Sequence, residues 1–523
     1  MTWKRGVFGF LALALTGFST PDLEAQDREE LALALDSYIE AVMERLEIPG
    51  LTLAVTRGEE VVYTGAFGVR SLESGEPMRA EYLFHMASVS KPFVATAVLQ
   101  LAEQGRIDLD EPVVTYLPYF ELADERYREI TVRQMLNHTS GMPDVDDYEW
   151  DKPEYDDGAA ERYVRSLIDE QMIAAPGELW RYSNMAFDVM GDVIAKVSGR
   201  PFEIYVKENI LNPLGMSESN FLYAETSEEL RTTGHVWRLE PVVSDVYPYN
   251  RRHAPSSTLN SSVLEMTNWA FANLNRGELN GERILTEESY ETLWTASAQV
   301  DEDRHVGLSW FLGSHRGIET VGHSGGDRGY SSQFTLLPAE GIGVIVASNY
   351  DRAPTWTIRD GVLDILLGYE PTMPKRHLGM AFAKEYVEQG IDAAKALYRR
   401  IEAEAADEYE FGDRQLAMVG WYFMDHDQVD QAIEVFRFNV QLFPTVGPYY
   451  ELAEAYEANG NRELAIENYS KALELRPDSQ TLKKKLAELR GIEPPRSSSS
   501  PSTIVTSTPP RCPSPKPRTP CGT

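Results

Sequence analysis

Apolar and polar positions follow two different periods along this chain, and the change between them marks the expected elements. Apolar residues 50–55 and 61–63 flank the polar turn 57–60, which predicts a β-hairpin. From about residue 107 to residue 299, apolar side chains recur at helical spacing. These stripes are Val132/Met135/Leu136, Phe187/Met190/Val193/Ile194 and Leu264/Trp269/Leu274. Short β-rich runs broken by Gly or Pro come next, at 307–311, 318–321, 332–336 and 343–347, and a helical pattern follows at 356–367.

Strands at both ends of a region, with helices between them, predict an α+β domain. We expect one antiparallel sheet formed by the N- and C-terminal segments, with flanking helices and an inserted helical lobe. The helix at 356–367 would pack on this sheet and end the domain near Gly368.

From residue 378 on, the sequence pattern is that of a repeat, in which residues of the same class recur 33 positions apart. The recurring pairs are Ala432/Ala465, Phe436/Tyr469, Pro444/Pro477, Gly420/Ala453 and Phe423/Tyr456. This pattern resembles the tetratricopeptide repeat, a helix-turn-helix of about 34 residues. Tyr386, Gly390, Ala393 and Leu397 suggest an earlier, degenerate unit, and three stacked units could bury a continuous core.

Both ends of the chain differ from the regions between them. Residues 1–5 are basic and residues 6–18 apolar, as in a secretory signal peptide, whereas no later run reaches the ~18 apolar residues of a membrane helix. We therefore expect an exported protein, periplasmic or extracellular, without a transmembrane anchor. The Ser/Pro/Thr-rich end predicts a disordered tail. The expected organisation is a signal peptide at 1–25, a hydrolase domain at 28–368, a linker at 369–377, helical repeats at 378–490 and a tail at 491–523.

Composition excludes several chemistries. A net charge of −33 disfavours binding to nucleic acid. The two cysteines, Cys512 and Cys521, lie in the tail, so cysteine catalysis and Cys-based metal sites are not expected. The chain has no His-Glu-x-x-His, and the acidic stretch 144–157 lacks the glycine at the sixth position of a calcium loop, which favours a solvated loop. We expect neither a metal nor a cofactor.

Ser88 and Lys91 form the only Ser-x-x-Lys in the chain. Residues three apart share a helix face, so the amine can take the proton of the serine hydroxyl. Pro92 fits only the first turn of a helix, which puts Ser88 at a helix N-terminus, where free N–H groups favour a developing negative charge. Alone, the pair could equally be a serine cap beside a solvated lysine. Two further motifs change this: the only Tyr-x-Asn, at 182–184, and the segment His323-Ser324-Gly325-Gly326.

With these three motifs in order, the chain from about residue 30 to 368 resembles the serine β-lactamase and penicillin-binding superfamily, in its class C, DD-peptidase and esterase branch. Residues 84–92, 136–141 and 283–285 are also similar to that family. The resemblance implies that Ser88 is acylated, that Lys91 activates it, and that Tyr182 exchanges protons with nucleophile and leaving group. Lys91 would be partly neutral through desolvation and nearby positive charge. The resemblance also implies that Asn184 binds the lysine or the substrate, and that His323, Ser324 and Gly325 bind substrate. The N–H groups of Ser88 and Gly326 would form the oxyanion hole.

His323 stands where the lactamases usually carry lysine, so a titratable group replaces a fixed cation. We therefore expect an exported serine hydrolase acting through an acyl-enzyme on an ester or amide, of D-alanyl carboxypeptidase or carboxylesterase type, with weak or no β-lactamase activity. Its substrate would be a small molecule or short peptide.

Three alternatives remain open. Residues 322–326 also match the Gly-x-Ser-x-Gly elbow of α/β-hydrolases, which needs a helix after the motif, whereas the sequence predicts another strand there. Asn184 could cap the helix that follows it. Finally, the repeats could make this a protein-binding module with a weakly active or inactive hydrolase scaffold.

Overall fold

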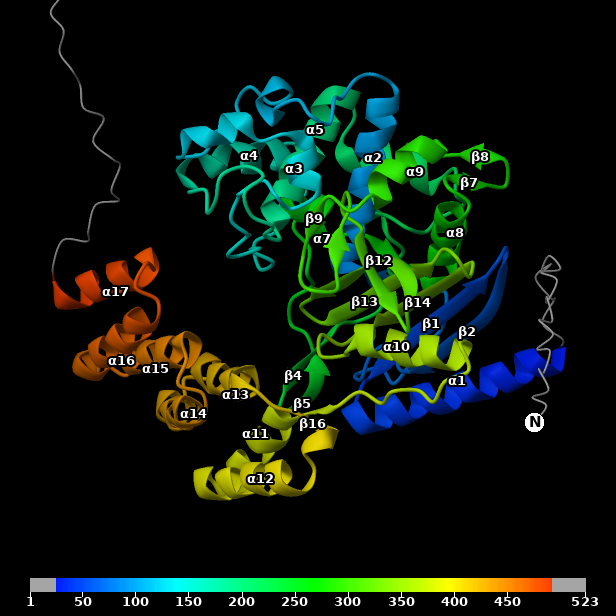
Figure 1. The fold of residues 1–523 in the computed structure, drawn as a ribbon. Helices are drawn as coiled ribbons and strands as arrows, with labels where there is room; N and C mark the ends of the chain where they lie inside the picture. The colour runs from blue at the N-terminus through cyan, green and yellow to red at the C-terminus, as the bar shows by residue number, and fades with distance from the viewer. Residues whose placement is uncertain (1–24, 492–523) are drawn as a thin grey trace, which may run out of the picture. The chain divides into compact units, whose positions relative to one another are not determined.

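The computed structural model describes residues 25–491 and divides into two compact units (Figure 1). The first unit ends at His377 and also includes Asp407–Glu410; the second comprises Leu378–Ala406 and the residues from Phe411 on. The expected signal sequence up to residue 24 and the tail from residue 492, with both cysteines, lie outside the described residues. Within residues 25–491, no helix is long and apolar enough to cross a membrane.

An eight-stranded antiparallel sheet forms the centre of the first unit, in the order β2-β1-β14-β13-β12-β11-β10-β9. The N-terminal hairpin lies beside the C-terminal strand, with Leu51 opposite Ser348. This confirms the predicted fold class and the sheet closed by both ends of the domain. The strands are β1 (Gly50–Arg57), β2 (Glu60–Gly68), β9 (Ala298–Gln299), β10 (His305–Val306), β11 (Phe311–His315), β12 (Ile318–Asp327), β13 (Tyr330–Leu337) and β14 (Ile342–Ser348).

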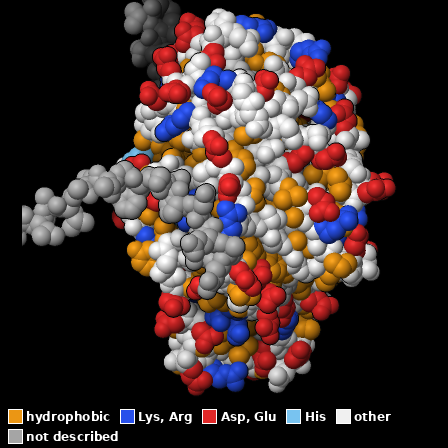
Figure 2. Space-filling model, turned by 90° about the vertical axis from the view of Figure 1, so that its right-hand side faces the viewer, with side chains coloured by type: hydrophobic (Ala, Val, Ile, Leu, Met, Phe, Trp, Pro, Cys, Tyr) orange, Lys and Arg blue, Asp and Glu red, His pale blue; other side chains and the backbone are white. Residues whose placement is uncertain are grey.

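Helices cover both faces of this sheet. On one face α10 (Thr355–Leu366) packs against β13 and β14, with α1 (Ala25–Leu46) beside it; α8 (Val263–Leu274) packs against β1 and β14 from the other (Figure 1). Strands β13 and β14 are buried along their whole length as a result. The outer surface is strongly acidic, and Figure 2 shows red carboxylate side chains scattered over one side of the molecule.

The helical lobe lies between β2 and β9 in the sequence. Its α-helices are α2 (Lys91–Glu103), α3 (Val132–Leu136), α4 (Ala159–Ser166), α5 (Asn184–Ser198), α6 (Phe202–Val206), α7 (Ala254–Ser257), α8 and α9 (Glu287–Trp294). Short strand pairs join its loops: β3 (Phe84–His85) with β6 (Asn260–Ser261), β4 (His235–Arg238) with β5 (Glu240–Val243), and β7 (Glu278–Leu279) with β8 (Glu282–Arg283).

One predicted strand was wrong. Residues 307–310 form the turn between β10 and β11, in which the Gly307 N–H donates to the Trp310 carbonyl at 2.8 Å and Ser309 adopts a left-handed φ of 73°. Leu308 and Trp310 are buried in this turn, so their apolar character reflects the core and not a pleated strand.

The second unit is a run of helices. They are α11 (Leu378–Gln389), α12 (Ile391–Glu404), α13 (Asp413–Asp425), α14 (Val429–Leu442), α15 (Val446–Ala458), α16 (Arg462–Leu475) and α17 (Gln480–Arg490). The pairs α11/α12, α13/α14 and α15/α16 pack as hairpins. Gly420 permits close packing within one of them, because a Cβ there would lie 2.2 Å from the Phe436 ring. The bridge β15 (Arg376–His377) to β16 (Tyr409–Glu410) belongs to the first unit.

Candidate active site

Ser88 lies in a 3₁₀ turn, Ala87–Ser90, that leads directly into α2. Ala87 before it adopts a left-handed φ of 49°, an uncommon conformation for a residue with a side chain and one that clusters at functional sites. Lys91 opens α2, and its Nζ donates to Ser88 Oγ at 2.9 Å. The amine and the hydroxyl are therefore in direct contact, as the Ser-x-x-Lys spacing predicts.

Lys91 is fully buried, and its second hydrogen bond goes to the Ser256 carbonyl at 2.7 Å. Burial lowers the Lys91 pKa to about 8. The expected contribution of nearby positive charge is wrong: Asp188, Asp327 and Asp144 are the charges that act on Lys91, and all three raise its pKa. Desolvation alone therefore makes the amine a usable base.

Tyr182 lies on the other side of the nucleophile. Its hydroxyl hydrogen-bonds to Ser88, and Lys91 Nζ is 5.0 Å from the centre of its ring. Burial raises the pKa of the Tyr182 phenol well above its usual value, so it stays protonated at neutral pH. One hydroxyl, one amine and one phenol thus converge in a partly buried space.

Asn184 is the first residue of α5, but its side chain points to a different partner than expected. Its Nδ2 donates to Asp144 Oδ1 at 3.0 Å, and its backbone N–H donates to the same oxygen at 2.7 Å. The capping interpretation of Asn184 is wrong, because Ser183 is the N-cap and accepts from the Ala186 N–H. Asn184 was a candidate hydrogen-bond partner for Lys91, but the Ser256 carbonyl accepts from the Lys91 amine instead.

Strand β12 carries the third motif. Strand β11 pairs only with residues 318–322 of it, so 323–327 have no strand partner on that side among the described residues. At Gly325 the strand passes so close to the Ser88 turn that a Cβ would lie 2.2 Å from the Met86 carbonyl oxygen. The glycine therefore lets an open strand edge approach the nucleophile. Because β13 follows β12 and no helix does, the α/β-hydrolase elbow is excluded.

His323 is almost completely buried on this strand. Its Nδ1 lies 2.6 Å from the Ser324 carbonyl oxygen, and its Nε2 has no hydrogen-bond partner. Burial, with the charge of Lys91, lowers the His323 pKa to about 3. The expected titratable cation is therefore a neutral imidazole at physiological pH.

A cavity of about 860 Å³ begins at His323 and Ser324 and extends to Trp356 and Arg359 on α10. The Arg359 guanidinium donates to Thr335 at 3.3 Å and pairs with Asp360 at 2.9 Å. The carbonyl oxygen of the buried Gln333 side chain has no hydrogen-bond partner. The charged residues that line this cavity are two arginines and four acidic residues: Arg304, Arg359, Asp301, Glu302, Asp303 and Asp360.

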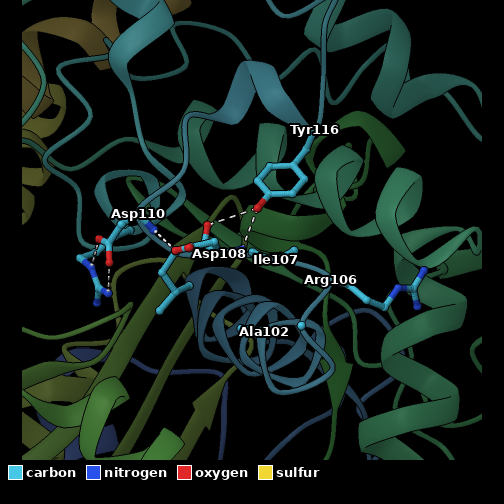
Figure 3. A pocket seen from close by; sticks show the side chains of 9 residues that line it. Ala102, Arg106, Ile107, Asp108, Asp110 and Tyr116 are labelled. Carbon is cyan, nitrogen blue, oxygen red and sulfur yellow. Dashed lines mark hydrogen bonds and ion pairs between the residues drawn. The ribbon is translucent and has the colours of Figure 1, made fainter.

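A second cavity, of about 450 Å³, lies at the C-terminal end of α2 (Figure 3). Its polar groups are bonded to one another: Tyr116 pairs with the Asp108 backbone, and Asp110 with Arg133. It contains no nucleophile, so it is not the candidate site. Among residues 25–491, no group of three His, Cys, Asp or Glu residues could hold a metal ion.

Three residues that support the site were not predicted from the sequence. Asp188 accepts from the Ser256 N–H at 3.2 Å and from His253 at 2.7 Å, directly behind the carbonyl that holds Lys91. Asp327 binds His85 at 2.8 Å and so links the end of β12 to the strand before Ser88. His138 stacks on Tyr182. Only His138 carried a signal, because it lies in the family-like segment 136–141.

The family model described as Beta-lactamase matches residues 35–365. The chain belongs to this family. A tetratricopeptide repeat model matches residues 446–479, which confirms a repeat in the second unit. Most of the first unit therefore lies within the Beta-lactamase match.

The curated relatives include an esterase and a protein named flp. Esterase EstB of Burkholderia gladioli is 34% identical over 234 residues, which cover 42% of this chain and 59% of the relative. Protein flp of Staphylococcus aureus is 24% identical over 316 residues, 60% of this chain and 62% of the relative. The chain thus spans about three fifths of the length of these relatives.

Solved structures give the same fold. The octameric penicillin-binding protein homologue from Pyrococcus abyssi superposes with a TM-score of 0.58 at 26% identity, covering 68% of this chain and 81% of that one. The β-lactamase/D-alanine carboxypeptidase from Pseudomonas syringae gives a TM-score of 0.55 at 20% identity, covering 65% and 100%. The second likeness concerns the fold alone.

Proposed function

We propose that this protein is an exported serine hydrolase that cleaves an ester or amide through an acyl-enzyme on Ser88. The observation that carries the proposal is the 2.9 Å contact between Ser88 Oγ and a buried lysine whose pKa is about 8. A lysine in this state is neutral often enough to accept a proton near neutral pH. Family membership and the esterase among the relatives support the same chemistry.

The steps follow from the positions of the groups. Lys91 takes the Ser88 proton while Oγ bonds to the substrate carbonyl carbon, and the N–H groups of Ser88 and Gly326 stabilise the oxyanion. Tyr182 gives a proton to the departing oxygen or nitrogen as that bond breaks, and is reprotonated from Lys91. Water then repeats the sequence on the acyl-enzyme and releases the acid. Asn184 and Ser324 would contact the substrate, which would lie along the open edge of β12.

Arg359, in the cavity that begins at His323 and Ser324, is a candidate partner for an anionic group of the substrate, which would have to compete with its present partner Asp360. His323 itself is neutral. A peptide ending in a D-alanyl carboxylate fits this arrangement, since its strand-like backbone could pair with β12 while its carboxylate lies toward Arg359. A carboxylesterase is the second candidate, favoured by the likeness to esterase EstB. The repeats would dock a protein partner or orient the hydrolase unit.

Mass spectrometry of the full chain after a fluorophosphonate and after penicillin tests the proposal. We expect added mass on Ser88 with the fluorophosphonate and none after Ser88→Ala. Ser324→Ala is the matched control, since its labelling at Ser88 should persist. A panel of D-alanyl-D-alanine peptides, p-nitrophenyl esters and a chromogenic lactam then ranks the substrates. If neither reagent adds mass and no substrate turns over, the chain is a binding module and the proposal is wrong.

A further inference from the structure

His138 makes three separate contacts with the segment that carries Tyr182. Its carbonyl accepts from the Arg181 N–H at 2.8 Å, and its Nδ1 accepts from the Ser183 N–H at 3.2 Å. Its ring stacks on the Tyr182 ring, with centroids 4.2 Å apart and planes 26° from parallel. One residue therefore binds the backbone on both sides of Tyr182 and also supports its ring.

The backbone of His138 is adapted to this arrangement. Its φ of 61° is left-handed, a conformation that is uncommon for residues with side chains but that His, like Asn and Asp, adopts more readily than the others. It is also fully buried, and its Nε2 has no hydrogen-bond partner. A buried polar atom without a hydrogen-bond partner is costly to keep, so a gain elsewhere is expected.

The charge state of His138 suits a supporting role. Because Nδ1 accepts the Ser183 N–H, the ring hydrogen lies on Nε2. Burial, with the charge on Lys91, holds the His138 pKa well below its usual value, so the ring stays neutral. A neutral ring can pack against Tyr182 without adding a second cation beside Lys91.

We propose that His138 is a positioning residue that fixes the Tyr182 hydroxyl against Ser88 for proton transfer to the leaving group. This inference rests on the proposed hydrolase function. No described hydrogen bond joins His138 to Ser88 or Lys91, so the proposal has it act through Tyr182. Its loss should therefore matter only while the Tyr182 hydroxyl is present.

Two substitutions separate the contacts. His138→Asn keeps an acceptor near the Nδ1 position and tolerates the left-handed backbone, but it removes the ring. His138→Phe keeps a ring and removes the acceptor. Misplacement of a catalytic group by about 1 Å costs on the order of 100-fold in rate. We expect His138→Asn to lower kcat for an alkyl ester, whose alkoxide leaving group needs a proton, by about 10- to 100-fold with little change in KM. His138→Phe should lose less, provided that it folds.

The deciding experiment is a double-mutant cycle with Tyr182→Phe. In the Tyr182→Phe background, His138→Asn should change kcat for the same alkyl ester by less than about 2-fold. His235→Asn is the control: His235 is another buried histidine with both ring nitrogens bonded, and its effect should multiply with that of Tyr182→Phe.

Each outcome has a distinct meaning. Equal kcat in wild type and His138→Asn, or multiplicative losses with Tyr182→Phe, would overturn the positioning role while leaving the hydrolase intact. Absence of labelling and turnover in the wild type would instead refute the hydrolase function itself. Thermal unfolding of every variant identifies a loss caused by misfolding. If His138→Asn does not fold, a kcat of His138→Phe below that of Tyr182→Phe would overturn the proposal, because a residue that acts through Tyr182 cannot cost more than loss of the Tyr182 hydroxyl.

Discussion

Asp188 controls how readily Lys91 becomes a base, and replacing it with asparagine tests this directly. The Asp188 carboxylate receives the Ser256 N–H at 3.2 Å, and the Ser256 carbonyl receives the Lys91 ammonium at 2.7 Å. Asn Oδ1 can accept the same N–H, so Asp188→Asn removes a charge and keeps the hydrogen bond. Because Asp188 is the largest influence that raises the Lys91 pKa, this substitution should lower it.

The magnitude follows from the neutral fraction of the amine. With a pKa of about 8, about one tenth of Lys91 is neutral at pH 7 and about nine tenths at pH 9, so acylation should rise about tenfold across this range. If Asp188→Asn moved the midpoint from 8 to 7, the neutral fraction at pH 7 would rise to about one half and acylation about fivefold. The variant should thus be faster than wild type at pH 7 and equal to it at pH 9.

Stopped-flow acylation by a p-nitrophenyl ester from pH 6 to pH 10 measures this midpoint. Asp192→Asn is the matched control, because Asp192 lies one turn further along α5 and binds Tyr119 at 2.6 Å. Its midpoint should stay at the wild-type value. A wild-type acylation rate that does not change with pH would refute the assignment of Lys91 as the base. A midpoint that Asp188→Asn moves to higher pH would refute the influence of Asp188 on the Lys91 pKa.

Three further predictions follow from the same geometry. Gly325→Ala places a Cβ 2.2 Å from the Met86 carbonyl oxygen, so β12 must shift; we expect a cost of about 1–3 kcal/mol in urea unfolding and almost complete loss of turnover. Lys91→Met removes a group whose folded pKa is lowered from 10.5 to about 8. Between pH 8 and pH 10.5 the unfolded wild type binds a proton that the folded protein does not, so the wild-type free energy of unfolding rises with pH. Relative to Lys91→Met, it should rise by about 3 kcal/mol from pH 7 to pH 11. Parallel plots of unfolding free energy against pH for the two proteins would contradict this. Arg359→Gln should raise KM for a D-alanyl-D-alanine peptide about tenfold and leave that for a neutral ester unchanged; equal effects on both would contradict an anion site.

Local patterns were enough to predict most of the elements. The hairpin at β1 and β2, the stripes of α3, α5 and α8, and the runs of β12, β13 and β14 all depend on side chains whose burial alternates with the local period. The pattern failed at residues 307–310, because a buried turn and a buried strand both require apolar residues. Ser88 and Lys91 come together because three-residue spacing on one helix is itself a local property.

Distant supports of the site could not be predicted in this way. The partner of Lys91 is the backbone carbonyl of Ser256, 165 residues away, and every residue type carries such a carbonyl. The neutrality of His323 results from burial beneath packed elements, which no motif specifies. The Tyr-x-Asn motif led us to expect Asn184 to contact Lys91 or the substrate. Its actual partner, Asp144, lies in a loop for which the sequence showed only an acidic composition.

The pairing of β1 with β14 has a consequence for how the chain is made. Val55 has no β14 partner until Val344 has been synthesised, so the N-terminal hairpin keeps an open hydrophobic edge while the helical lobe and strands β9 to β13 are added. Contacts this distant slow folding and prolong exposure to aggregation. A ribosome-bound fragment ending before β14 should therefore bind chaperones and resist compaction, and release of the final strand should be the event that makes the hydrolase unit resistant to protease.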